Sequence, residues 1–138
     1  MTVARIFLIA ILGPVISMMD IRYRRIPNRL LCLFAAATTA LYLAWPPGSA
    51  AAVRVTLVSA LVLLPLFLAG SSSIGAGDIK LMILLALLLG NGGQVLTAFT
   101  VAALIACGEL LFARIFRGKF PESIAFAPAL MMGALFCV

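Results

Sequence analysis

The sequence SSSIGAGDIKLM, residues 71–82, places the carboxylate of Asp78 at the point where a long apolar run begins. Acids are scarce here, because the chain has four Asp and Glu against ten Lys and Arg, and 65% of its 138 residues are hydrophobic. Soluble domains are about half apolar. This composition therefore predicts an integral membrane protein, in which a charged residue needs a specific reason for its position.

Six apolar segments follow one another along the chain, and no polar stretch between them is long enough to fold alone. We expect one all-α transmembrane domain over residues 1–138, a bundle of about six helices. The first segment ends in Ser-Met-Met-Asp, a poor cleavage site, so it is expected to be a retained helix and not a signal peptide. The expected segments are 3–19, 30–45, 53–70, 78–90, 95–116 and 123–138.

The basic residues cluster in alternate loops, after the first, third and fifth segments. Lys and Arg are enriched in cytoplasmic loops, so these loops are expected in the cytoplasm and both termini outside. Bases in short loops between apolar runs also argue against nucleic-acid binding. The clustered bases are Arg22, Arg24, Arg25, Arg29, Lys80, Arg114, Arg117 and Lys119.

The chain has no histidine, and its cysteines, Cys32, Cys107 and Cys137, form no CxxC pair. Each lies in an apolar run and is expected to be a small buried hydrophobe. A zinc or redox site would lack ligands, so no metal and no cofactor is expected.

Two of the four acids are expected at the same membrane face. Asp20 ends the first helix there, and Asp78 begins the fourth. Two close carboxylates repel, which separates their apparent pKa values, so that one can activate water while the other polarises a carbonyl. Gly75 and Gly77 would allow unusual backbone conformations and the close approach of an extended peptide. Two plainer readings stay open: Asp78 as a helix N-cap, and Asp20 as a boundary charge offset by nearby arginines.

Three motifs in this order resemble the prepilin peptidases, membrane aspartic proteases of the GxGD type, and most of all the small Flp/Tad-type forms. The motifs are DIRYRRIPNRL from Asp20, GAGDIKLM from Gly75 and AFAPALMMGAL from Ala125. The resemblance implies that Asp20 and Asp78 are catalytic. It also implies that the substrate is a type IV prepilin, whose short basic leader is removed at the cytoplasmic face of the bacterial inner membrane.

The resemblance leaves other activities and substrates open. About twenty residues precede the first aspartate, without the cysteine-paired region of bifunctional relatives, so N-methylation is not expected. A related protease of preflagellin-like substrates, or a non-enzymatic transporter or scaffold subunit, are the alternatives. The lipid bilayer and the prepilin are the expected partners, and the sequence does not give the oligomeric state.

Roles within the site can be predicted from helix ends. Asp78 lies at a helix amino end and Asp20 at a helix carboxyl end, which favours Asp78 as the ionised base. Lys80, Arg25 and Glu109 are possible supporting residues, and Glu109 could equally be held by a structural partner such as Lys80 or Arg114.

Two prolines are expected to shape helices and not to take part in chemistry. Pro27 with Asn28 is expected to open the second helix, and Pro128 is expected to kink the last one.

Overall fold

The computed structural model describes residues 2–45, 48–68, 75–117 and 125–138, and these residues form six helices. The predicted segments are confirmed to within a few residues, although the expected end of the third segment and the expected start of the last one lie outside the described residues. The helices are α1 Thr2–Tyr23, α2 Asn28–Ala44, α3 Ser49–Leu68, α4 Ala76–Leu89, α5 Gly92–Arg117 and α6 Ala127–Cys137.

Local backbone geometry explains where the first helices end and begin. Arg24 has a positive φ of 50°, and its N–H donates to the carbonyl of Asp20 at 2.8 Å, so α1 stops there. Pro27 is the N-cap of α2, and its carbonyl accepts from the N–H of Leu30 at 3.0 Å. The prediction that Pro27 and Asn28 open the second helix is thus confirmed.

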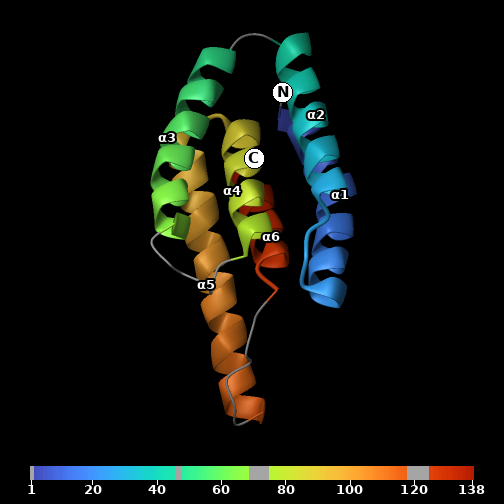
Figure 1. Cartoon of the computed structure of the whole chain (residues 1–138), viewed down its shortest axis with the longest axis vertical. Coiled ribbons are helices and arrows are strands. Elements are labelled where there is room, and N and C mark those ends of the chain that lie inside the picture. Colours follow the sequence, from blue (N-terminus) through green and yellow to red (C-terminus); the bar gives the residue numbers. More distant parts are fainter. Residues whose placement is uncertain (1, 46–47, 69–74, 118–124) are drawn as a thin grey trace.

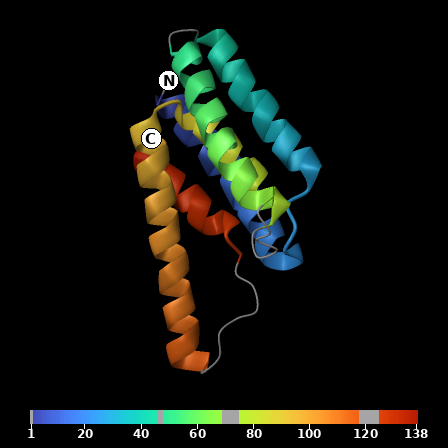
Figure 2. The same ribbon diagram turned by 60° about the vertical axis from the view of Figure 1, so that its left-hand side comes forward.

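The helices run alternately up and down the bundle (Figure 1). The end of α1 and the beginnings of α2 and α4 therefore lie at one end of the molecule. Helix α6 packs against α1, α4 and α5, and α3 packs mainly on α4. In the turned view, α3 and α5 stand apart along one side of the bundle (Figure 2). The largest fully buried side chains are Ile16, Phe34, Thr38, Leu81, Leu85, Leu88, Leu89 and Leu130.

The outer surface of the bundle is apolar. Large hydrophobic side chains are exposed on every helix except the central α4, for example Phe7 at 63% and Leu61 at 75% exposure, which is the pattern of a surface that faces lipid. By length and composition, α1 and residues Gly92–Phe116 could each cross a membrane, and three further apolar helical segments are shorter. The fold is consistent with a helical membrane protein.

The expected burial of the cysteines is wrong. Cys32 and Cys107 are exposed, and Cys137 is half-buried. Apolar residues point outward as well as inward in this bundle, so an apolar neighbourhood in the sequence does not imply burial.

The contact between α5 and α6 depends on Gly133. A Cβ atom at this position would overlap the carbonyl oxygen of Ala98 and lie 3.2 Å from the backbone nitrogen of Ala102.

The expected kink at Pro128 is wrong, because Pro128 lies in the first turn of α6, where a proline fits without breaking a hydrogen bond.

A polar network joins three helices at the end of the bundle opposite Asp20. Arg5 of α1 donates to the hydroxyl of Tyr42 of α2 at 2.8 Å, and this hydroxyl donates to the carbonyl of Leu88 of α4 at 3.3 Å. The guanidinium of Arg5 also lies 5.7 Å from the centre of the Tyr42 ring. The network sits at the carboxyl end of α4, where the helix dipole favours a cation.

Replacing Gly90 with alanine is expected to lower the free energy of unfolding by roughly 2 to 4 kcal/mol. Gly90 caps α4 with a left-handed φ of 67°, and a Cβ there would overlap the hydroxyl of Tyr42. Thermal or denaturant unfolding in detergent measures the effect. Gly92→Ala is the matched control, because nothing lies within 4 Å of its added Cβ. An equal effect of both substitutions would show that the Tyr42 contact is not responsible.

Candidate active site

A pocket of about 300 Å³ lies at the end of the bundle where α1 stops and α2 and α4 begin. It brings together the first two sequence motifs, although their aspartates are far apart along the chain. The pocket is lined by Asp20, Arg24, Arg25, Ile26, Asn28, Gly75, Ala76, Gly77, Asp78 and Lys80. Both aspartates therefore line one pocket at the same end of the bundle, and the assignment of this end to a membrane face stays a prediction.

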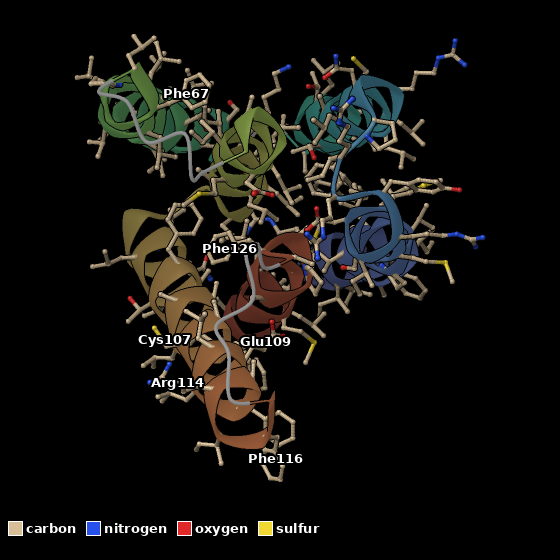
Figure 3. The ribbon with its side chains drawn as sticks, turned by 60° about the horizontal axis from the view of Figure 1, so that its bottom comes forward. Phe67, Cys107, Glu109, Arg114, Phe116 and Phe126 are labelled. Carbon is tan, nitrogen blue, oxygen red and sulfur yellow. The ribbon has the colours of Figure 1, made fainter. Side chains whose placement is uncertain are left out.

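Asp20 is held at the junction of two helices. It lies in the last turn of α1, is only 6% exposed, and its Oδ2 accepts a hydrogen bond of 3.0 Å from the backbone N–H of Ala127. Ala127 is the first residue of α6 and follows Phe126, which is labelled near the centre of Figure 3. The carboxyl group thus satisfies one of the free N–H groups at the start of α6.

Asp78 lies in the first turn of α4 and is half-buried. The N-cap of α4 is Gly75, whose carbonyl accepts from the N–H of Asp78 at 3.0 Å. The alternative in which Asp78 is the N-cap is therefore wrong. Its side chain is instead a wall of the pocket that Asp20 also lines.

The helix ends do not distinguish the two aspartates. Asp78 belongs to the first turn of α4, and Asp20 accepts a hydrogen bond from the first turn of α6. The positive end of a helix dipole therefore favours a negative charge at both positions. The prediction that Asp20 lies at an unfavourable helix end took account of α1 alone. Because Asp20 also accepts a hydrogen bond from the start of α6, the helix dipoles do not show which aspartate is the ionised base.

The two glycines of the GxGD motif provide space and not unusual backbone angles. Gly75 has an ordinary extended conformation, with φ −66° and ψ 137°. A Cβ on Gly75 would lie 3.2 Å from Oδ2 of Asp78, and a Cβ on Gly77 would lie 3.3 Å from the side chain of Ile26. The predicted conformational role is therefore wrong at Gly75, whereas the close approach of an extended peptide stays a prediction.

Cations surround the pocket mouth. Lys80 donates to Oδ1 of Asn28 at 3.1 Å and so ties the start of α4 to the start of α2. Arg24 and Arg25 also line the pocket and are exposed. The structure places Lys80 and Arg25 in the pocket wall.

Glu109 does not belong to this pocket. It is exposed on α5, and Figure 3 shows it on a part of that helix that lies apart from α1, α2 and α4. Lys80, one of its two suggested partners, is hydrogen-bonded to Asn28 instead.

Sequence reasoning missed three contributors to the pocket. Arg24 was treated only as a loop charge, and Asn28 only as a helix start, although both stand inside the first motif. The N–H of Ala127 reaches Asp20 across 107 positions of the chain. Ala127 belongs to the third motif, which is the one signal in the sequence that this segment contributes to the site. The motif does not show that a backbone N–H of this segment binds Asp20.

Comparisons with known proteins give one match. A family model described as "Type IV leader peptidase family" matches residues 6–113, which include both aspartates and the pocket between them. Neither the curated proteins nor the solved structures give a significant match. Within the described residues, no group of three or more His, Cys, Asp or Glu side chains is arranged to hold a metal ion.

Proposed function

Because the chain belongs to the type IV leader peptidase family, we propose that it is an aspartic endopeptidase that removes the basic leader of Flp/Tad-type prepilins. Asp20 and Asp78 are its catalytic pair. The observation that carries this proposal is the shared pocket, in which two carboxyl groups from separate motifs face the same space beside exposed backbone at Gly75 and Ala76.

The reaction needs only the two carboxyl groups and a water molecule. One carboxylate removes a proton from the water molecule while the oxygen of that water attacks the scissile carbonyl carbon. The second carboxyl group, which is protonated, donates a hydrogen bond to the carbonyl oxygen. The resulting tetrahedral species collapses when the leaving nitrogen receives a proton and the C–N bond breaks. Two neighbouring carboxyl groups can share one proton, because two negative charges at close range repel.

The protein supports this chemistry by fixing both acids on helices. The hydrogen bond from Ala127 holds the Asp20 side chain, and its low exposure of 6% keeps that side chain out of bulk solvent. The missing side chain of Gly75 leaves room beside Asp78, so that a peptide backbone can approach the carboxyl group, and Gly77 lets Ile26 pack closely against the start of α4.

The proposed topology places the pocket at the cytoplasmic face of the bacterial inner membrane. The exposed bases Arg22, Arg24, Arg25, Arg29 and Lys80 all lie at the pocket end of the bundle, and the positive-inside rule assigns such an end to the cytoplasm. All six helices then span the bilayer, and both termini lie outside. A prepilin inserted in the same membrane would present the junction between leader and hydrophobic helix at this depth.

Cleavage in reconstituted membranes tests the proposal. The purified chain is reconstituted with a prepilin, a preflagellin-like protein or a short transmembrane stub, and each product is read by mass. Loss of a leader-sized mass from the prepilin is expected, with the cut ahead of the hydrophobic helix. Cleavage of another substrate but not the prepilin would assign a related protease. Failure to cut any of them would overturn the peptidase assignment and favour a non-enzymatic membrane subunit.

A further inference from the structure

A second concave surface lies between α3 and α5, at the end of the bundle opposite the aspartates. It is a groove of about 520 Å³, and it shares no lining residue with the aspartate pocket. One face of α3 and the first two turns of α5 form its walls. The lining residues are Ala51, Arg54, Val55, Val58, Ser59, Val62, Leu63, Gly92, Val95, Leu96 and Phe99.

The floor of this groove is buried and its rim is exposed. Leu63 and Val95 are 9% and 6% exposed, whereas Val58, Val62 and Leu96 at the edges are 62%, 62% and 71% exposed. Apart from Arg54 and Ser59, every lining side chain is apolar. An occupant of this groove therefore needs a hydrocarbon surface along most of its length.

Arg54 provides a single positive charge near one end of the groove. In the part of the chain that the structure describes, Arg54 has no hydrogen-bond or ion-pair partner. Helix α3 contains no acidic residue, and Asp20 and Asp78 lie at the other end of the bundle. The planar guanidinium of an arginine binds phosphate oxygens through two parallel hydrogen bonds.

The length of the groove fits one leaflet of a bilayer. Its wall on α3 extends from Ala51 to Leu63, which corresponds to about 18 Å along a helix. Half of a hydrocarbon core is about 15 Å thick. A membrane-spanning peptide helix would have to continue toward the aspartates, but the groove stops before α3 ends.

We propose that this groove binds an anionic phospholipid from the leaflet opposite the aspartate pocket, with its phosphate on Arg54 and one acyl chain between α3 and α5. The lipid joins two helices that otherwise stand apart along this side of the bundle (Figure 2). This site is separate from the proposed peptidase chemistry and requires only that the helices lie in a bilayer.

Tryptophan quenching tests the proposal in vesicles of phosphatidylcholine that contain increasing fractions of phosphatidylglycerol with brominated acyl chains. Trp45 is the one tryptophan of the chain and is first replaced by phenylalanine. Leu96→Trp then reports on the groove rim. Leu104→Trp, on the same helix but outside the groove, is the matched control, because the two leucines are 71% and 68% exposed.

The Leu96→Trp variant should reach half of its maximal quenching at a lower phosphatidylglycerol fraction than the Leu104→Trp variant, by about two-fold or more. Arg54→Gln should remove this difference, and brominated phosphatidylcholine should quench both variants alike. Equal curves at the two positions, or a difference that survives Arg54→Gln, would overturn the proposal.

Native mass spectrometry provides a second readout that does not depend on the tryptophan variants. The otherwise unchanged chain should retain one phosphatidylglycerol, and Arg54→Gln should lose it. Arg29→Gln, at an exposed arginine of the other end, should keep it. A dimer mass in place of the lipid adduct would assign the groove to a second copy of the chain, and no adduct in any form would also contradict the lipid site.

Discussion

Replacing either Asp20 or Asp78 with asparagine is expected to reduce leader removal by about 10³-fold or more. Either change leaves a group that cannot exchange a proton, so the pair no longer supplies both an acid and a base. The double variant should be no slower than the single ones, because the two carboxyl groups act as one unit. Initial rates of cleavage in proteoliposomes, followed by product mass, give the comparison.

The asparagine substitutions should leave the fold in place. The amide oxygen that replaces a carboxylate oxygen in Asp20→Asn can still accept the hydrogen bond from Ala127. Glu109→Gln makes the same chemical change at an exposed acid outside the pocket and should keep full activity. If either asparagine variant folds normally and cuts at the original rate, the proposed catalytic pair is wrong.

Replacing Gly133 with alanine is expected to lower the free energy of unfolding by about 3 kcal/mol or more. The added methyl group would overlap the backbone of α5 at Ala98, and a backbone cannot move aside as the end of a side chain can. Close helix contacts in membranes depend on such small residues. Thermal unfolding in detergent, compared with the unsubstituted chain, measures the loss.

The same substitution should also reduce peptidase activity, because α6 carries the N–H that holds Asp20. Gly108→Ala on α5 is the matched control, since nothing lies within 4 Å of its added Cβ. The control should be neutral or slightly stabilising, because alanine favours a helix more than glycine does. Equal stability of the two variants would show that the tight contact between α5 and α6 does not limit the fold.

The sequence was sufficient to predict six helices and to bring Asp20 and Asp78 to one end of the bundle. Both predictions depend on strong local signals, which are long apolar runs and bases in alternate loops. Counting the runs then places the end of the first helix and the start of the fourth at the same face. The pocket that contains both aspartates follows from this order.

The finer features of the site depend on which faces of the helices meet, and an almost wholly apolar chain does not encode this in its periodicity. Buried and lipid-facing positions carry similar residues, so Cys32 was wrongly expected inside. The contacts of Asp20 with Ala127 and of Gly77 with Ile26 join separate helices or loops. Such contacts follow from tertiary packing and not from local preference.

The network of Arg5, Tyr42 and Leu88 has a mechanical consequence for the opposite end of the bundle. It fastens α1, α2 and α4 together at the end far from the aspartates, so that any tilt of α4 would turn about this point. The 14 residues of α4 span about 21 Å. A tilt of about 13° at this point would move the Asp78 end by about 5 Å, roughly the spacing between neighbouring β-strands. For the peptidase proposed above, a rotation of this size would open as much space beside Asp78 as one extended strand occupies, once the hydrogen bond between Lys80 and Asn28 is released.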